Sequence, residues 1–139
     1  MKIRDFLKIK DRPVVTIGPD ETISLAIQKL VENNIGALPV CDEKGMLLGI
    51  ISERDLLKAV FQHADATGST KVRDVMTKDV AIARPEDELD YAAVVMKHEK
   101  IRHLPVVVNK KLQGIVSMRD IVSRQLMEAE LEIRYLKSW

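Results

Sequence analysis

Two short segments carry residue types and spacings suited to holding a polar ligand. Ser52 and Asp55 are separated by two residues, and Ser117 and Asp120 repeat this spacing. A helix that begins at the serine would offer unpaired backbone N–H groups to an anion, and the aspartate could accept hydrogen bonds from two adjacent ribose hydroxyls. The same spacing also forms a capping box, in which both side chains bond the backbone at a helix start. Spacing alone leaves both roles open.

A second group of candidates is basic. Arg102 and His103 precede a Leu-Pro pair, and Arg84 precedes Pro85. Arginine can donate two hydrogen bonds to a phosphate in a bidentate arrangement, and histidine can add another donor. From the residues alone, the simpler interpretation is that Arg102 and His103 are solvated charges at a turn between a helix and a strand.

The segments that would position these residues occur twice in the chain. Residues 35–40 (IGALPV) match residues 101–106 (IRHLPV), and residues 49–55 (GIISERD) match residues 114–120 (GIVSMRD). The chain is therefore two copies of one unit of roughly 60 residues, a size that is marginally stable alone. We expect the two copies to share a hydrophobic core.

A polar segment without hydrophobic periodicity separates the copies. We assign residues 1–61 to the first copy, residues 62–70 to a linker and residues 71–139 to the second copy. The leading segments of the two copies, residues 2–7 (KIRDFL) and 71–76 (KVRDVM), also match.

Each copy predicts the element order β-α-β-β-α, which gives a mixed α/β (α+β) fold of two repeats related by a pseudo-twofold axis. The first strands are expected at residues 14–17 and 80–83, and Pro19 and Pro85 are expected to open the helices that follow. The other predicted strands are residues 38–41, 47–51, 104–108 and 112–116. The last helix of each copy begins at the serine of the motif, and the second of these helices extends towards the end of the chain.

Composition narrows the class of protein. The 139 residues are 46% hydrophobic and 31% charged, with a net charge of +1, which argues against nucleic-acid binding driven by bulk charge. No apolar run approaches the ~20 residues of a membrane span, and no signal peptide is recognisable, so we expect a soluble cytoplasmic protein. The single cysteine, Cys41, is expected to be buried and unreactive. The three histidines lack the spacing of a metal site.

The repeated Leu-Pro-Val strand and the repeated Gly-Ile-x-Ser-x-Arg-Asp segment resemble the cystathionine β-synthase (CBS) domain, and two in tandem resemble a Bateman module. Members of this family bind adenosine-containing ligands, such as AMP, ADP, ATP, S-adenosylmethionine and NAD-type dinucleotides, between their repeats and act as sensors. The resemblance implies that Asp55 and Asp120 bind ribose. It also implies that Ser52 and Ser117 contact ribose or phosphate, and it adds Arg119 of the second motif to the ligand-binding set.

In this family, each pocket takes its ribose-binding aspartate from one repeat and its phosphate contacts from the other. Three basic residues of the second repeat would therefore share a pocket with Asp55: Arg84, Arg102 and His103. Three small residues occupy the equivalent positions of the first repeat and would share a pocket with Asp120: Gly18, Gly36 and Ala37. We expect unlike pockets, with a phosphorylated nucleotide in the first and a neutral or cationic adenosyl ligand, or none, in the second.

The resemblance implies a regulatory module that senses cellular energy through AMP, ADP or ATP and passes a conformational change to a protein partner. A structural homodimerisation module with empty pockets is the alternative. No enzyme motif is found, and the barrel of an IMP dehydrogenase, an enzyme associated with CBS domains, is absent from these 139 residues. An apolar stripe near the C-terminus has the spacing of a short coiled coil and predicts a homodimer: Leu126, Ala129, Ile133 and Leu136.

Overall fold

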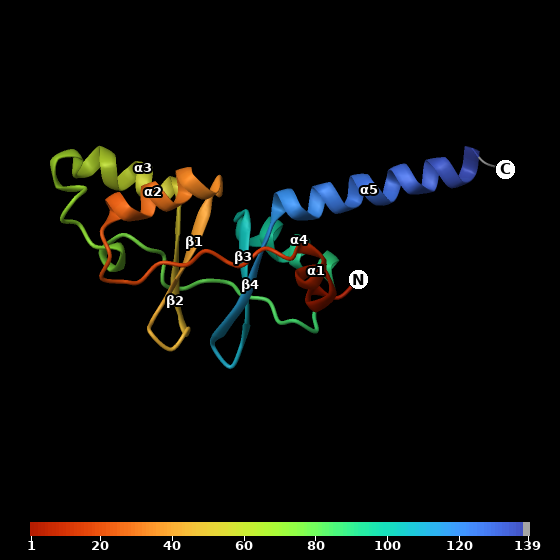
Figure 1. The fold of residues 1–139 in the computed structure, drawn as a ribbon, viewed down its shortest axis with the longest axis horizontal. Helices are drawn as coiled ribbons and strands as arrows, with labels where there is room; N and C mark the ends of the chain where they lie inside the picture. The colour runs from red at the N-terminus through yellow and green to blue at the C-terminus, as the bar shows by residue number, and fades with distance from the viewer. Residues whose placement is uncertain (138–139) are drawn as a thin grey trace.

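The computed structural model describes residues 1–137 and has the mixed α and β composition that the repeat predicts (Figure 1). Its helices are α1 (Ile3–Lys10), α2 (Ile23–Asn33), α3 (Glu53–Gln62), α4 (Leu89–Glu99) and α5 (Met118–Lys137). Its strands are β1 (Ala37–Cys41), β2 (Leu47–Ser52), β3 (His103–Val108) and β4 (Lys111–Ser117). Short 3-10 turns are η1 (Ala64–Ala66) and η2 (Val72–Asp74).

Each repeat contributes one antiparallel hairpin, β1–β2 in the first and β3–β4 in the second, as predicted. The tips of the hairpins are hydrogen-bonded to each other. The Leu47 N–H donates to the Lys110 carbonyl at 2.8 Å, and the Leu112 N–H donates to the Gly45 carbonyl at 3.1 Å. From these joined tips, β2 and β4 run towards the two Ser–Asp motifs. Both motifs therefore lie at the ends of the hairpins that are far from the tips (Figure 1).

The strands predicted at 14–17 and 80–83 are reduced to a single bridge residue each. Ile17 pairs with Val40, and Ala83 pairs with Val106, both in parallel orientation. The next N–H needed to continue each ladder would come from the residue two positions on, which is a proline in both repeats. Because proline has no N–H, the pairing stops after one residue.

The helices expected to open at Pro19 and Pro85 begin four residues later, at Ile23 and Leu89. In the first repeat, the Thr22 hydroxyl accepts the Leu25 N–H at 3.2 Å and caps the helix there. The residues before each helix form a turn whose carbonyls accept hydrogen bonds from the leading segment of the other repeat instead.

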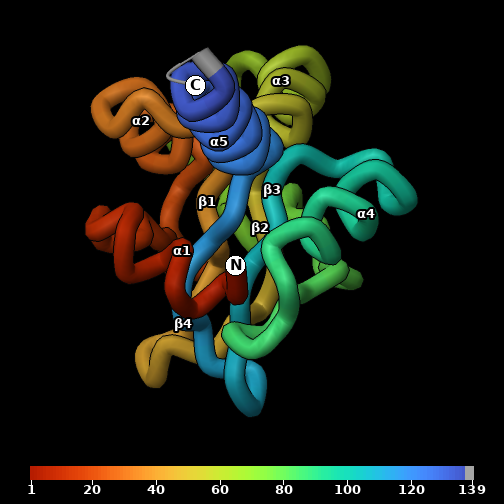
Figure 2. The backbone as a smooth tube through the Cα atoms, turned by 90° about the vertical axis from the view of Figure 1, so that its right-hand side faces the viewer, coloured from red at the N-terminus to blue at the C-terminus, as the bar shows by residue number. Residues whose placement is uncertain are grey.

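The leading segments are exchanged between the repeats. The Ile3 N–H donates to the Asp87 carbonyl at 2.9 Å, and the equivalent Val72 N–H donates to the Glu21 carbonyl at 2.8 Å. Both α1 and η2 therefore pack on the repeat that they do not precede. Figure 2 shows α1 and α4 on opposite sides of the β3–β4 hairpin.

The expectation of one shared core is wrong, because the buried side chains form two clusters. The first-repeat cluster includes Val72 from η2, and its other members are Ile17, Ile23, Ala26, Leu30, Leu38, Val40, Ile51, Leu56 and Ala59. The second-repeat cluster includes two residues of α1, and its members are Ile3, Phe6, Ala83, Leu89, Ala92, Met96, Leu104, Val106, Val116 and Ile121. Each cluster is completed by a segment of the other repeat, and this exchange makes the two units depend on each other.

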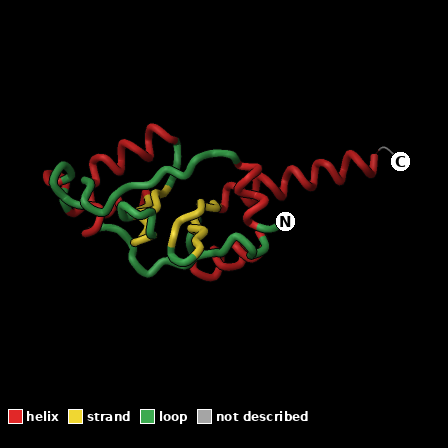
Figure 3. The backbone as a smooth tube through the Cα atoms, turned by 60° about the horizontal axis from the view of Figure 1, so that its bottom comes forward, coloured by secondary structure: helices red, strands yellow, loops and turns green. Residues whose placement is uncertain are grey.

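Helix α5 extends well beyond the rest of the fold (Figures 1 and 3). The stripe residues Leu126, Ile133 and Leu136 are 61%, 52% and 62% exposed. Ser138 and Trp139, at the end of the predicted final helix, lie outside the described residues. Among residues 1–137, none of the helices combines the length and hydrophobicity that crossing a bilayer requires.

Candidate functional site

The two Ser–Asp motifs occupy equivalent positions, each at the point where a hairpin ends and a helix begins. Ser52 ends β2, directly before α3, and Ser117 ends β4, directly before α5. In the first motif, the Ser52 N–H donates to Asp55 Oδ2 at 2.9 Å and the Asp55 N–H donates to Ser52 Oγ at 3.3 Å. The second motif repeats both bonds, at 2.9 and 3.0 Å. The capping box is therefore present in both repeats, and ligand binding by these residues stays a prediction.

The surroundings of Asp55 come partly from the second repeat. Thr77 forms an antiparallel bridge with Ile50 of β2, with backbone bonds of 2.9 Å in both directions. This bridge brings the Thr77 hydroxyl to 3.5 Å from Asp55 Oδ1. The Ser52 hydroxyl also donates to Asp55 Oδ2 at 3.0 Å. Asp55 is thus surrounded by neutral donors.

Asp120 has a different neighbour. Lys10, the last residue of α1, donates to Asp120 Oδ2 at 2.9 Å and to the Ile115 carbonyl at 3.2 Å. Both side chains of this ion pair are largely shielded from solvent, with 21% and 22% exposed. Burial alone would raise the pKa of Asp120, but the hydrogen bond from Lys10, those from Ser117 and the positive charge of Lys10 outweigh it and lower that pKa.

Lys10 was missed by the sequence analysis. The match of the leading segments pairs Lys10 with Asp79, which predicts no equivalent role for the two residues. The structure shows why the match fails there: the leading segment of the first repeat continues as an eight-residue helix, whereas that of the second forms only a three-residue turn. No signal in the sequence indicates that this helix ends beside Asp120.

His103 lies at the contact between the repeats. It pairs with Ser117 at the start of β3, as Ala37 pairs with Ser52 in the first repeat. A Cβ atom on Gly36 would lie 3.1 Å from Cε1 and 3.2 Å from Nε2 of the His103 ring. The glycine therefore gives the histidine of the other repeat room to pack against the backbone.

Several charges act on the His103 ring. Burial lowers the pKa of His103, and the positive charges of Lys10 and Arg102 lower it further, whereas Glu53 and Asp120 oppose the shift. The net effect is a lowered pKa, so the imidazole is predominantly neutral at pH 7. Glu53 of the first repeat was also missed by the sequence analysis, because Met118 occupies the matching position in the second repeat.

The other predicted ligand-binding residues differ in their exposure to solvent. Arg84, Arg102 and Arg119 are exposed, Gly18 is half-buried and Ala37 is buried. Among the interactions of residues 1–137, no hydrogen bond or ion pair joins Asp55 to one of the basic residues predicted to share its pocket. The two predicted pocket groupings stay predictions, and the charges near Asp120 show that its surroundings include a cation.

The family follows from comparison with known proteins. The sequence profile of the CBS domain matches residues 3–62 and 72–126, which include parts of both repeats. The chain belongs to the CBS-domain family. Inosine-5'-monophosphate dehydrogenase of Methanocaldococcus jannaschii is 40% identical over 126 residues, which cover 90% of this chain. The chain spans only 24% of the length of that dehydrogenase.

Solved structures share the whole CBS-domain pair. The CBS-domain containing protein ATU1752 from Agrobacterium tumefaciens is 38% identical with a TM-score of 0.82, and the match covers 90% of this chain and 99% of that one. The CBS domain pair of protein MJ0100, in complex with 5'-methylthioadenosine and S-adenosyl-L-methionine, is 31% identical with a TM-score of 0.80. That match covers 93% of this chain and 98% of the MJ0100 chain.

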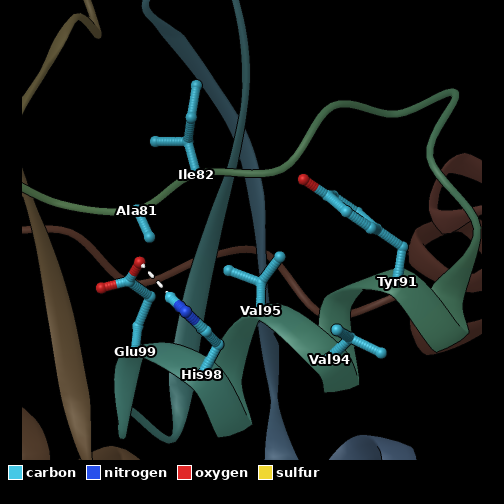
Figure 4. Close-up of a pocket in the computed structure, with 7 residues that line it drawn as sticks. All are labelled: Ala81, Ile82, Tyr91, Val94, Val95, His98 and Glu99. Carbon is cyan, nitrogen blue, oxygen red and sulfur yellow. Dashed lines mark ion pairs between the residues drawn. The ribbon is translucent and has the colours of Figure 1, made fainter.

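Two hollows of this CBS pair lie away from the predicted ligand-binding residues. One, of about 390 Å³, lies beside α4 and is bordered by Tyr91, Val94 and the ion pair between His98 and Glu99, whose atoms are 3.5 Å apart (Figure 4). His98 is exposed. The other, of about 510 Å³, is an apolar groove between α2 and α3. No predicted ligand-binding residue lines either hollow.

The predicted burial of Cys41 is confirmed. It is buried and unpaired at the end of β1, and burial, with the negative charge of Asp42, raises the pKa of its thiol. A raised pKa keeps the sulfur in its less reactive protonated form. Within residues 1–137, no group of three or more potential metal-ligating side chains is brought together.

Proposed function

We propose that this CBS-domain pair is a regulatory module that binds an adenosine-containing ligand between its repeats and transmits binding to a protein partner. The observation that carries the proposal is the placement of the two aspartates. Each stands at a helix start and contacts the leading segment of the other repeat, through Thr77 for Asp55 and through Lys10 for Asp120. A ligand held by either aspartate would therefore act on both repeats at once. The adenosyl ligands of MJ0100 support the ligand class.

At finer detail, we propose AMP, ADP or ATP as the ligand and energy sensing as the role. The phosphates would be held by three exposed or half-buried basic residues: Arg84, Arg102 and His103. Ser52, Ser117 and Arg119 would complete the polar contacts, and the predicted pocket of Asp120 would include the small residues Gly18, Gly36 and Ala37. The cytoplasmic location and the boundaries of the two copies stay predictions.

A ligand screen tests the proposal. Thermal unfolding would be followed with AMP, ADP, ATP, S-adenosylmethionine and NADH, and the Asp55→Asn/Asp120→Asn double variant would serve as the control. A ligand at a hundred times its dissociation constant stabilises the folded state by about 2.7 kcal/mol. We expect such a shift with at least one ligand in the wild type and its loss in the control. No shift with any of them at millimolar concentration, and no heat in calorimetry, would overturn the proposal.

Regulation rather than catalysis is the role we infer, although one relative is a dehydrogenase. The match covers 24% of that enzyme, and the aligned region of this chain is the CBS-domain pair itself. In such an enzyme, the pair is a regulatory part joined to a separate catalytic domain. We therefore place the catalytic activity, if this module controls one, in a partner.

We also propose that the protein forms a homodimer through α5. The exposed positions Leu126, Ile133 and Leu136 follow coiled-coil spacing on a helix that leaves the fold, so a second copy of the same helix offers a matching apolar face. Light scattering tests this proposal with Leu126→Glu/Ile133→Glu and with a chain truncated after Ser123. Gln125→Glu is the control on a polar position of the same helix. A dimer that survives both changes would show that the copies associate elsewhere or that the pair is a purely structural module joined through other helices.

A further inference from the structure

The two helix starts are built alike but are paired with different side chains. Asp55 has the Thr77 hydroxyl 3.5 Å from its Oδ1, a long contact with a neutral group. Asp120 has the Lys10 ammonium 2.9 Å from its Oδ2. This difference concerns the two carboxylates on which the proposed ribose contacts depend.

Lys10 is held in place by more than its charge. Ile3 and Phe6 bury α1 in the second-repeat cluster, and the side chain of Leu7 covers Gly114 of β4. The helix ends at Lys10, whose ammonium group also donates to the Ile115 carbonyl at 3.2 Å. The ammonium group is therefore anchored by a backbone acceptor as well as by the carboxylate.

This arrangement leaves Asp120 poorly available to a sugar. Its Oδ2 accepts from the Ser117 N–H and from the Lys10 ammonium, both at 2.9 Å, whereas the side-chain donors to Asp55 are neutral hydroxyls. Two adjacent hydroxyls bind a carboxylate better when its negative charge is not already compensated by a cation. A ligand at Asp120 would have to displace Lys10 or share its acceptor.

We propose that Lys10 is a built-in occupant of the Asp120 pocket, so that ligand fills the Asp55 pocket first. The inference rests on the proposed function, because it concerns the order in which the two pockets take an adenosyl ligand. Binding at Asp120 then requires the release of Lys10 from the end of α1. In this proposal the Asp55 carboxylate is available to a ligand, whereas the Asp120 carboxylate is occupied by a side chain of the same protein.

Calorimetry with adenosine and with AMP tests this order on the full chain. Lys10→Met should add a second binding event or tighten the weaker event about tenfold, the equivalent of one charge-assisted hydrogen bond. Lys8→Met removes the same charge from an exposed position of α1 and should leave binding as in the wild type. Lys10→Met/Asp120→Asn should lose the gain, because the freed carboxylate is then absent. Lys10→Gln replaces Lys10→Met if the latter does not give a wild-type melting curve.

A ligand-free measurement separates this inference from the proposed function. In carbon-13 NMR titrations, the pKa of the Asp120 carboxyl should rise in Lys10→Met and should not change in Lys8→Met. An unchanged Asp120 titration would overturn the inference whatever the ligands do. Weaker or unchanged binding by Lys10→Met would overturn it too, as would two equal sites in the wild type. If neither the wild type nor any variant binds a probe, the proposed function falls and the inference with it.

Discussion

Asp55 and Asp120 occupy equivalent backbone positions in the two repeats but have different electrostatic surroundings. Both aspartates close a capping box with a serine, and both serines end a strand of an equivalent hairpin. Around Asp55 the structure places hydroxyls, whereas around Asp120 it places the ammonium group of Lys10. The comparison shows that a repeated motif determines where a carboxylate stands, while segments that are not repeated determine what charge it meets.

The largest expected effect is the loss of ligand affinity when Asp55 is removed. Asp55→Ala deletes an acceptor of two hydrogen bonds to a ribose, and bonds to a charged group are worth about 1.5–3 kcal/mol each. Calorimetry with the ligand found in the screen should show affinity weakened by about a hundredfold or more. Asp120→Ala should weaken binding much less, because Lys10 already compensates that carboxylate.

The control separates this loss from the loss of a helix cap. Asp55→Asn keeps an oxygen that can accept the Ser52 N–H but removes the charge, so stability should stay close to that of the wild type while affinity falls. Asp55→Ala removes only the bond from the Ser52 N–H and keeps the Ser52 cap, so it should cost at most about 1 kcal/mol of stability. If Asp55→Ala lowers only stability and affinity is intact, the motif serves the helix and not a ligand.

The next effect compares two equivalent glycines. A Cβ on Gly49 would lie 2.5 Å from the Thr77 carbonyl oxygen, which the bridge to Ile50 holds in place. A Cβ on Gly114 would lie 2.9 Å from Leu7 Cδ2, the end of a flexible side chain. Overpacking costs about 1–3 kcal/mol, so Gly49→Ala should approach the upper value and Gly114→Ala the lower in urea unfolding. Equal costs would mean that the two leading segments pack with the same rigidity.

The repeat predicted the hairpins and the helix starts after Ser52 and Ser117 because these depend on local patterns, whereas the helices expected at Pro19 and Pro85 begin four residues later. The Leu-Pro-Val strands, the turns and the Ser–Asp caps lie where the sequence places them. The exchange of leading segments could not be predicted, since Ile3 and Val72 are apolar whichever cluster they complete. Lys10 and Glu53 were not predicted as site residues for the same reason. Their roles depend on contacts across the repeats, and neither has an equivalent in the other copy.

A smaller effect concerns the phosphate of the ligand. Arg102 belongs to the second repeat. If its side chain contacts the phosphate of the ligand, Arg102→Ala should weaken the affinity for AMP by about tenfold or more, the value of one charge-assisted bond, and leave the affinity for adenosine unchanged. The first repeat carries Gly36 at this position, so the variant makes the two repeats more alike. Competition binding with AMP and adenosine measures the difference. Equal losses for both ligands would assign Arg102 to the fold and not to phosphate recognition.

The smallest expected effect is a pH dependence that only the second repeat can have. The position of His103 is Ala37 in the first repeat, so the inter-repeat contact holds an imidazole on one side only. Burial against Gly36 lowers the pKa of His103 below its ordinary value of 6.5. At a pH between the lowered pKa of the folded chain and 6.5, the unfolded chain binds a proton that the folded chain does not bind.

The sign of the effect follows from this difference in bound protons. The free energy of unfolding should rise with pH across that window. The contribution of His103 is fully present above 6.5 and is lost as the pH falls through the lowered pKa. His103→Gln should remove this slope in urea unfolding measured from pH 5 to 8, and the exposed His98→Gln is the matched control. Addition of AMP should reverse the trend if the phosphate lies beside His103, because a bound anion favours the imidazolium and AMP affinity would then fall as pH rises. A slope that persists in His103→Gln would show that the burial of this ring against Gly36 is not what distinguishes the repeats in their response to acid.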